Sequence, residues 1–496
     1  MKDENDAECP SPDDDDLIRE AGLQKTHSGY VEWQKDHSEY PRNWRLSRKI
    51  YDTTIIVFLE FYTTVISTTG PSAAKNTMNE HQISRTLSLV AFTFMYQLGQ
   101  ALGGLLMPPM SESFGRRKAY IYSSAVFSIA SLITGVVPHV AGVYVGRVIA
   151  GFASAIPSVV LAGSIEDMYR PRVRVWLILL WNSFTTLGLC MGPIYGSYIS
   201  HAIGWRWIYY TSAILTASLC IPLSFIRESR SSKLLSQKHE SLKGKTNQDD
   251  LRIHETPDNV SSRHDFIHVV LFRPLRLATT EPIVIMVSVL NATAWGIIYL
   301  FTECLTIVYA QRGWTDQTSS LSFLAIGTGI VISLLPRFRD LKLMKQGRSE
   351  PEDKLTGFAI GAPSLAIGLW LFAWTIPPRV RTHWLPSMLG LLLVGFATNE
   401  FAYTLNGYLA DSYSIYAASS LAALALTRAL VSGVMPLFAH QMFTGLDTNL
   451  AASVLAAVAT LYCVAPVVFL KYGKQMREAS EFARHSAEVN KRHGEE

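Results

Sequence analysis

Charge is scarce in this sequence. Charged residues make up only 17% of the 496 positions, whereas a typical soluble domain contains about 25%. The net charge is only +4, and the basic residues are spread over several separate segments. This composition is not typical of a soluble domain, and it gives no indication of a nucleic-acid-binding patch.

Cysteine and catalytic signatures are also sparse. The five cysteines, none of which stands in a CxxC pair, are Cys9, Cys190, Cys220, Cys304 and Cys463. They are interpreted as free thiols because neither a disulfide framework nor a zinc site has this spacing. The sequence contains no HExxH, GxSxG or Walker-type loop. We therefore expect no enzyme activity, no nucleotide-driven pump, no metal and no cofactor.

Hydrophobic residues, by contrast, are abundant and gathered into blocks. They make up 49% of the chain and form about twelve runs of roughly 18 to 25 residues, each long enough to cross a bilayer as a helix. The approximate spans are 50–72, 86–108, 119–138, 141–163, 174–199, 205–226, 281–304, 317–336, 358–376, 384–406, 414–438 and 448–470. The sequence predicts an all-α membrane protein with twelve transmembrane helices.

Basic residues in alternate loops orient these spans. They precede span 1 and follow spans 2, 4 and 8, as Arg42, Arg45, Arg48, Lys49, Arg116, Arg117, Lys118, Arg170, Arg172, Arg174, Arg337, Arg339, Lys342, Lys345, Arg348 and Lys354. The opposite loops carry only Lys75, Arg85, Arg312, Arg379 and Arg381. By the positive-inside rule, both termini and the long middle loop are predicted to be cytoplasmic.

Polar segments divide the chain. An acidic run at 13–16 stands where a cleavable signal would need an apolar stretch. The predicted parts are a disordered N-terminal tail at 1–49, six-helix halves at 50–226 and 281–470, a linker at 227–280 and a C-terminal tail at 471–496.

Ionisable residues inside the spans are candidate functional groups. Glu60 lies about 15 Å along its helix from Ile50, and a charge at that depth costs roughly 2.5 kcal/mol or more unless it faces water or a partner. A permanently protonated or paired structural glutamate is the alternative. Arg147 requires a carboxylate, a carbonyl or water nearby. Glu400 in span 10 is a second acid of this kind, and Arg428 lies in span 11.

A glycine stripe marks span 5. Gly188, Gly192 and Gly196 recur every four residues, so they share one helical face, and Pro193 removes a backbone donor beside the middle glycine. Such a face allows another helix to approach closely, and the bend provides a pivot for a two-state bundle. Ordinary small-residue packing of a kinked helix is the alternative.

The loop after span 2 carries Glu112, Gly115, Arg116 and Arg117. An acid, a glycine and adjacent cations in a short turn can pair with helix ends in one conformation and release them in another. The same residues also suit a simple topology signal.

Several motifs together resemble the major facilitator superfamily, specifically the fungal twelve-span drug:proton antiporters. The resemblance spans about residues 41 to 484. It rests on PRNW (41–44), SESFGRRK (111–118), RVIAG (147–151), GSIEDMYRPR (163–172), GLCMGPIYGS (188–197), WRW (205–207), ESR (228–230), PEDKL (351–355), ADSY (410–413), AASSLAALALTR (417–428), MPLF (435–438) and KYG (471–473). Pro108, Ser113 and Ser197 depart from the usual motifs, and Glu303 is unexpected in its stretch. Its position near the outer end of span 7 predicts a solvated rim residue.

The resemblance implies two six-helix halves that rock around a central site and export a small, partly hydrophobic compound in exchange for protons. Glu60 is the first candidate for the proton site, Glu400 the second, and Arg147 a supporting charge. Candidate substrate contacts are Asn182, Phe184, Trp295, Tyr299, Phe396, Asn399 and Tyr403. The implied partners are a small-molecule substrate, protons and the bilayer, and the expected state is a monomer.

Alternatives remain open at this point. An uptake carrier for a nutrient shares the fold, although the spans here hold mostly apolar and small residues. A membrane-embedded enzyme would require clustered catalytic residues, and a receptor-like sensor would require a signalling domain. The expected location is the plasma membrane, with the vacuolar membrane as the alternative.

Overall fold

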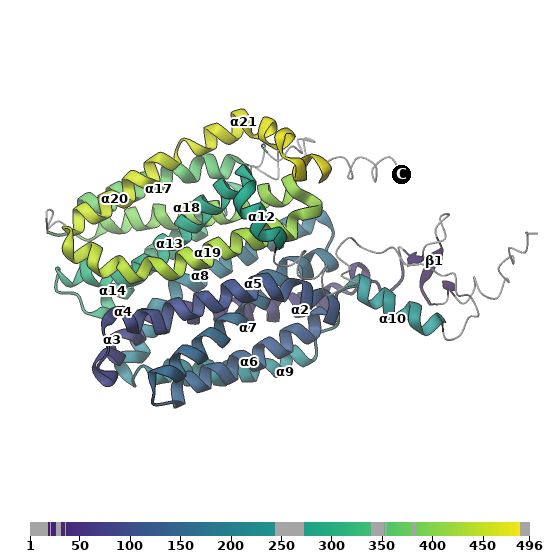
Figure 1. The fold of residues 1–496 in the computed structure, drawn as a ribbon, viewed down its shortest axis with the longest axis horizontal. Coiled ribbons are helices and arrows are strands. Elements are labelled where there is room, and N and C mark those ends of the chain that lie inside the picture. The colour runs from purple at the N-terminus through teal and green to yellow at the C-terminus, as the bar shows by residue number, and fades with distance from the viewer. Residues whose placement is uncertain are drawn as a thin grey trace, which may run out of the picture.

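The computed structural model describes residues 18–19, 21–25, 31–34, 36–243, 272–338, 352, 355–378 and 383–486. Long helices running side by side make up nearly all of this structure (Figure 1). Eleven helices in the described part are long and apolar enough to cross a membrane. The predicted eighth span differs from the others because its helix is interrupted between residues 320 and 323.

The first half contains the helices that follow the N-terminal segment. A short 3-10 turn, η1 (Pro41–Asn43), leads into this half. Its elements are α2 (Leu46–Ser67), α3 (Gly70–His81), α4 (Arg85–Leu89), the π-helix η2 (Val90–Phe94), α5 (Met95–Phe114), α6 (Arg116–Val136), α7 (Val140–Met168), α8 (Pro171–Ala202) and α9 (Arg206–Ser224).

The second half follows a segment that includes α10 (Ser231–Lys243). Its elements are α12 (Arg273–Thr280), α13 (Pro282–Ala310), α14 (Asp316–Ser320), α15 (Phe323–Ile332), α17 (Thr356–Thr375), α18 (Leu385–Tyr413), η5 (Ser414–Tyr416), α19 (Ala417–Gly445), α20 (Thr448–Tyr462) and α21 (Ala465–Ala479). Helix α21 extends through Lys471, so the predicted start of the C-terminal tail lies inside a helix.

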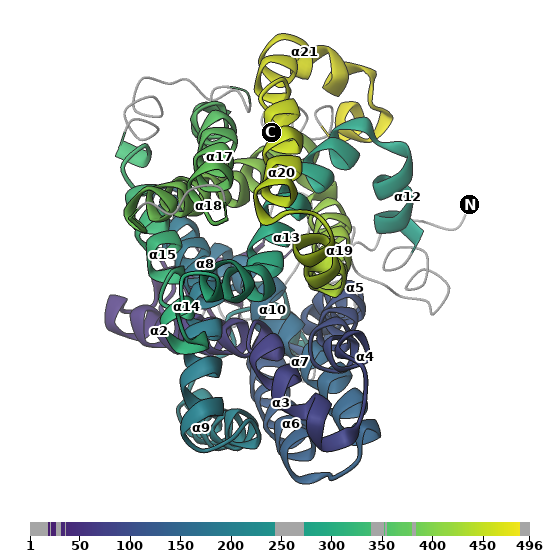
Figure 2. The ribbon, with the colours of Figure 1, turned by 90° about the vertical axis from the view of Figure 1, so that its left-hand side faces the viewer.

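The two halves lie against each other along the bundle. Viewed from one end, α2–α9 form the lower group and α12–α21 the upper one, and α5, α8, α13 and α19 lie between them (Figure 2). Helix α5 packs on α19, and α8 packs on α13, α15 and α18. We call the end with α3, α4 and α14 the far end, and the end with α10 the linker end (Figure 1).

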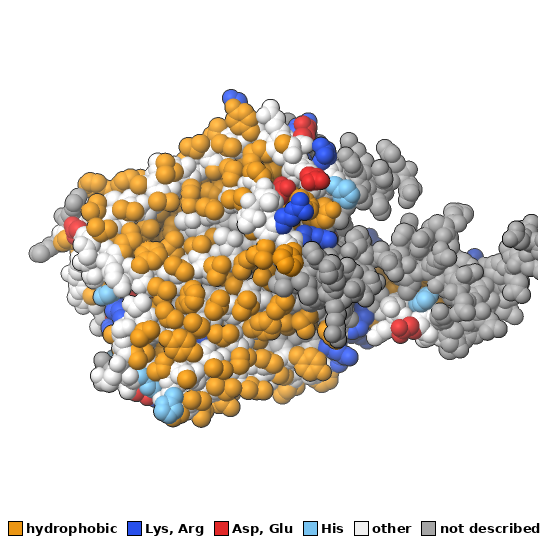
Figure 3. Space-filling view, in the orientation of Figure 1, with side chains coloured by type: hydrophobic (Ala, Val, Ile, Leu, Met, Phe, Trp, Pro, Cys, Tyr) orange, Lys and Arg blue, Asp and Glu red, His pale blue; other side chains and the backbone are white. Residues whose placement is uncertain are grey.

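On the face shown in Figure 3, apolar side chains cover most of the bundle, and charged side chains gather near its two ends. The exposed side chains include Ile129, Ile214, Ile367 and Val467, each at least 59% exposed. Such a surface is stable in lipid and not in water, because a large continuous apolar face is costly to hydrate. The predicted all-α membrane protein is therefore confirmed.

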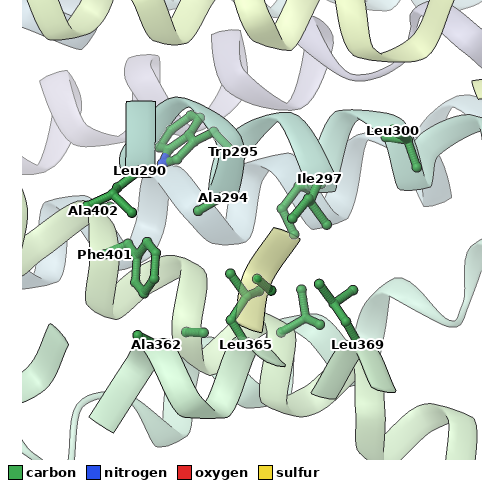
Figure 4. Close-up of a cluster of buried hydrophobic side chains, with 14 of the residues drawn as sticks. Leu290, Ala294, Trp295, Ile297, Leu300, Ala362, Leu365, Leu369, Phe401 and Ala402 are labelled. Carbon is green, nitrogen blue, oxygen red and sulfur yellow. The ribbon is translucent and has the colours of Figure 1, made fainter. Parts of the chain in front are cut away.

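One part of the core of the second half lies between α13, α17 and α18. Leu290, Ala294, Ile297 and Leu300 on α13 pack with Ala362, Leu365 and Leu369 on α17 and with Phe401 and Ala402 on α18, whereas the Trp295 ring points away from them (Figure 4). All of these side chains are buried. Helix α19 of the same half covers another face of α13, and α8 of the first half also contacts α13.

A small module lies outside the bundle at the linker end. Strand β1 (Leu23–Lys25) pairs antiparallel with β2 (Val31–Trp33), and Leu23 and Val31 pack with Leu242 of α10. The Trp33 indole also donates a hydrogen bond to the Ser231 carbonyl (3.2 Å). The prediction of disorder across 1–49 is therefore wrong for these strands, because their few apolar side chains are buried against the linker helix.

Candidate functional site

The carboxyl group of Glu60 is buried in α2. The residue is 2% exposed, and its Oε1 accepts a weak hydrogen bond from Thr64 Oγ1 (3.4 Å). Its Oε2 is buried without a hydrogen-bond partner among the described residues. Since buried polar atoms are nearly always paired, an unpaired carboxyl oxygen at mid-helix is a feature that requires a functional explanation.

Arg428 on α19 brings a positive charge toward this carboxyl group from the other half. The centre of its guanidinium lies 4.2 Å from the ring centre of Trp295, and its charge interacts with both Glu60 and Tyr299. No carboxylate of the described chain lies within ion-pair distance of Arg428. The sequence signalled this residue as an ionisable group inside a span, but our candidate list did not include it.

Tyr299 joins the two halves directly. Its hydroxyl shares a 2.7 Å hydrogen bond with Ser67 Oγ on α2. Trp295 lies one turn before Tyr299 on α13, and Glu60 lies two turns before Ser67 on α2. At 1.5 Å per residue, Glu60 and Trp295 are therefore about 5 Å apart in depth. The structure thus brings Trp295 to about the level of Glu60, and it places Tyr299 about one turn farther toward the far end.

Unpaired polar atoms gather at this junction. Besides Glu60 Oε2, the Nε1 of Trp295 and the Nε2 of Gln97 are buried without hydrogen-bond partners within the described ranges. Gln97 on α5 approaches the Tyr299 side chain. We call Glu60, Gln97, Trp295, Tyr299 and Arg428 the central cluster. The cluster contains one carboxyl group, one guanidinium group and polar atoms that remain available for a ligand.

Arg147 is held by backbone carbonyls. It is 1% exposed, its Nε donates to the Phe92 carbonyl (2.7 Å), and its Nη2 lies 3.5 Å from the Ile66 carbonyl. Its guanidinium also lies over the Tyr96 ring at 4.4 Å. Phe92 belongs to the π-helix, where the widened turn alters the usual helical hydrogen bonding. The sequence left a carboxylate, a carbonyl and water open as partners of Arg147, and the structure shows backbone carbonyls.

Asn399 links three helices. Its Oδ1 accepts a hydrogen bond from Thr186 Oγ1 (3.2 Å), and its Nδ2 donates to Ser183 Oγ (3.1 Å) and Ser333 Oγ (2.7 Å). Ser183 and Thr186 lie on α8 of the first half, whereas Ser333 caps the end of α15. This buried network therefore ties the two halves together near the middle of α18.

Glu400 is in a different setting from Glu60. It forms a buried ion pair with Arg337, just beyond α15, and the Arg337 guanidinium lies 4.6 Å from the ring centre of Tyr403. The sequence placed Arg337 among the basic loop residues that follow span 8, and the structure shows that its side chain is only 3% exposed. The two candidate acids therefore belong to separate clusters, and Glu400 has a positive partner within its own half.

The remaining substrate-contact candidates are dispersed. Asn182 donates to the Ile178 carbonyl of its own helix (3.2 Å), and Phe396 is buried. Phe184 is 47% exposed and meets Phe61 edge to face, with ring centres 6.5 Å apart. Within the described residues, none of these three side chains makes a hydrogen bond, ion pair or ring contact with the central cluster.

The predicted switch loop is tied to its own half at the linker end. Arg116 pairs with Asp167 at the end of α7 (Nε–Oδ2 2.8 Å). The Glu228 carboxylate accepts hydrogen bonds from the backbone amides of Arg116 (2.9 Å) and Arg117 (3.2 Å), which are free donors at the start of α6. Gly115 adopts φ +93°, where a side chain would be strained. The side chain of Glu112 lies outside the described residues.

The glycine stripe of α8 faces α2 and α3. A side chain at Gly192 would overlap Thr68, and one at Gly188 would meet the Phe61 carbonyl at 2.9 Å. The close approach also allows Thr68 Oγ1 to donate to the Leu189 carbonyl (3.2 Å). At Gly196, a side chain would meet Ser72 at 3.1 Å, and Pro193 is buried within the continuous helix. The stripe thus fits the small-residue packing that sequence reasoning offered as the alternative to a pivot.

Two ion pairs join the halves at the far end. Lys75 pairs with Asp316, and Arg85 pairs with Glu303, both at 2.5 Å. Gln441 on α19 also donates to Thr86 Oγ1 (3.3 Å). Glu303 is 3% exposed, so the expectation of a solvated rim residue is wrong. The rise per residue along α13 predicts how deep Glu303 lies, but it cannot predict that α4 of the other half packs over this residue.

The cysteine interpretation is confirmed for four positions. Cys190, Cys220, Cys304 and Cys463 are free thiols, and Cys9 lies outside the described residues. In the described part of the chain, no group of three or more His, Cys, Asp or Glu residues is arranged to hold a metal ion.

Known transporters are similar to this chain in sequence. The chain is 30% identical to the major facilitator-type transporter sor6 of Hypocrea jecorina over 488 residues, which cover 93% of this chain and 91% of that protein. It is 29% identical to the efflux pump FUB11 of Gibberella moniliformis (86% and 73% covered) and to the ascochitine biosynthesis cluster MFS transporter of Didymella fabae (91% and 89%).

Solved structures agree with the fold. A partially occluded inward-open conformation of the xylose transporter XylE from E. coli matches with a TM-score of 0.60 and 17% identity, covering 88% of this chain and 99% of that one. The family model for the Major Facilitator Superfamily matches residues 54–470. With a matching family model over most of its length and the same helical fold, the chain belongs to the major facilitator superfamily of transporters.

Proposed function

We propose that this transporter exports a small, partly hydrophobic organic compound in exchange for protons. The central cluster carries the proposal, because it combines a buried acid with an unpaired oxygen, an arginine from the opposite half and aromatic side chains. A proton binds at Glu60 in one conformation and leaves in the other, and the substrate binds between Glu60, Trp295 and Tyr299.

Arg428 couples proton binding at Glu60 to the relative position of the two halves. A nearby guanidinium stabilises the ionised form of a carboxyl group, and Glu60 and Arg428 lie on different halves. When the halves rock so that the two side chains approach, Glu60 releases its proton; when they separate, Glu60 binds one. The far-end ion pairs favour closure of that end in the present conformation, so release is directed toward the linker end.

We assign the linker end, with both termini, to the cytoplasm. The clustering of basic residues at this end supports that orientation. Proton release toward the cytoplasm is then the downhill direction at a plasma membrane that maintains an inward proton gradient. We propose the plasma membrane as the location, with the vacuolar membrane as the alternative, and a monomer as the transporting unit.

The substrate is proposed to be a secondary metabolite or a toxin. The names of the relatives, an efflux pump and a transporter of a biosynthesis cluster, support this substrate class. The cluster itself supports an aromatic or partly apolar compound with at least one hydrogen-bonding group, because Trp295 Nε1 and Gln97 Nε2 are available to bind one.

Accumulation measurements test this proposal. Labelled amphipathic compounds are supplied to cells that express the wild type, Glu60→Gln or Glu478→Gln, with and without a proton-gradient uncoupler. Glu478→Gln is the matched control because it makes the same change at an exposed position of α21. We expect expression to lower accumulation, and both the uncoupler and Glu60→Gln to abolish the effect.

Other results would revise specific parts. Higher accumulation on expression would replace export with uptake. Gradient-dependent export that survives Glu60→Gln would move the proton site elsewhere, with Glu400 as the next candidate.

A further inference from the structure

A cavity of about 580 Å³ lies at the linker end, where the N-terminal segment meets the start of α2. Its walls include Trp44 and Tyr51 and three arginines, Arg45, Arg48 and Arg227. Arg45 and Arg48 come from the start of α2, whereas Arg227 follows α9. Two segments far apart in the sequence therefore bring their positive charges to one opening.

The positive charge of this cavity is only partly compensated. Arg48 pairs with Asp52 (Nε–Oδ1 3.2 Å), and Asp52 also accepts a hydrogen bond from the Arg227 backbone amide (3.4 Å). Within the described ranges, the side chains of Arg45 and Arg227 have no hydrogen bond or ion pair. Glu39 lines the cavity but is paired with Lys238. Two guanidinium groups therefore remain available for an anion.

The start of α2 also favours an anion in the cavity. Its N-cap residue, Arg45, makes no side-chain capping bond, and its first turn holds no acidic residue. The first amides of a helix carry a partial positive charge and lack partners within the helix. An anion in the cavity would thus meet both the arginines and this helix end, which is a favourable setting for a phosphate group.

Apolar side chains beside the cavity indicate what carries the phosphate. Leu46 and Ile50 on α2, and Ile221 and Phe225 at the end of α9, are all at least 52% exposed. The two helix ends are held together here, because Tyr51 donates a hydrogen bond to the Pro222 carbonyl (3.1 Å). In a membrane protein such side chains face acyl chains, so the cavity opens at the depth of lipid headgroups.

We infer that this cavity binds the phosphate headgroup of an anionic phospholipid, with Arg45 and Arg227 as its charge-assisted hydrogen-bond donors. The acyl chains lie along Leu46, Ile50 and Phe225. A bound lipid would join the first and last helices of the first half at the linker end. The site is separate from the central cluster, so this inference does not depend on the transported substrate.

Native mass spectrometry of the purified protein tests the site. The wild type, Arg45→Gln, Arg227→Gln and Arg484→Gln are titrated with phosphatidate and, in parallel, with phosphatidylcholine. Arg484→Gln is the matched control, since it removes an exposed arginine at the same end of the molecule. A fourth variant, Arg45→Lys, retains the charge.

We expect phosphatidate to bind the wild type more tightly than phosphatidylcholine. Its dissociation constant should rise about fivefold for each cavity arginine removed, with little change in Arg45→Lys and none in Arg484→Gln. Equal binding of phosphatidate by the wild type and both cavity variants would show that this cavity is not the lipid site. Displacement of phosphatidate by low-millimolar inorganic phosphate would contradict a lipid ligand and would indicate a site for soluble phosphates.

Discussion

Arg85 on α4 and the buried Glu303 on α13 form a partly buried ion pair that joins the two halves at the far end. A second pair, Lys75–Asp316, lies at the same end. Because the Glu303 carboxylate is buried, its pair with Arg85 favours the conformation that contains it. The exposed Lys75–Asp316 pair contributes less. Both pairs must separate if the halves are to open at the far end.

Glu303→Gln is therefore expected to favour opening of the far end. Each 1.4 kcal/mol lost from the closed state raises the ratio of open to closed molecules about tenfold. The measurement is the labelling rate, with a membrane-impermeant thiol reagent, of a cysteine introduced by Thr302→Cys, a position that is buried in this structure. Labelling should be faster in the double variant Thr302→Cys, Glu303→Gln than in Thr302→Cys alone.

Glu80→Gln is the control for that experiment. Glu80 pairs with Arg206 at the same end, but both residues belong to the first half. Loss of this pair should leave the labelling rate unchanged. Equal acceleration by both variants would show that general loosening, and not the contact between halves, controls access.

Gly192→Ala is expected to destabilise the protein by about 1–3 kcal/mol, because the added methyl group overlaps Thr68 across the α8–α2 contact. Thermal unfolding in detergent provides the measurement. Gly407→Ala is the matched control, since that helical glycine has open space where its side chain would stand. There the substitution should be neutral or slightly stabilising. A tolerated alanine at position 192 would contradict the packing role of the stripe.

Arg147→Lys is expected to lower both thermal stability and transport. Lysine retains the charge, but it cannot reproduce the planar guanidinium that reaches the Phe92 carbonyl while lying over the Tyr96 ring. The unfolding temperature and the export rate are measured on the same preparation. Lost transport at unchanged stability would instead assign Arg147 a direct part in coupling.

Glu400→Gln is expected to destabilise the protein by up to about 3 kcal/mol, because it removes the carboxylate that pairs with the buried guanidinium of Arg337. Arg337→Met in the same chain should recover most of that loss. A double-mutant cycle on the unfolding free energy measures the interaction directly. Simple addition of the two single effects would mean that the pair contributes little.

Several features followed from sequence patterns alone. The apolar blocks predicted a helical membrane protein because only long apolar helices satisfy every backbone group in lipid. Glu60 and Arg147 stood out because charges inside such helices are rare. The glycine spacing predicted that one face of α8 would accept a close neighbour, and α2 occupies that position.

Other relationships depended on how distant helices pack. The sequence determined which residues are polar, how deep each one lies along its own helix and which face it shares. Only the tertiary structure decided that Arg428 approaches Glu60 from the other half, that Arg337 neutralises Glu400 and that α4 covers Glu303. The physical reason is that helical periodicity and rise are local properties, whereas burial and charge pairing depend on which helix of the other group lies alongside.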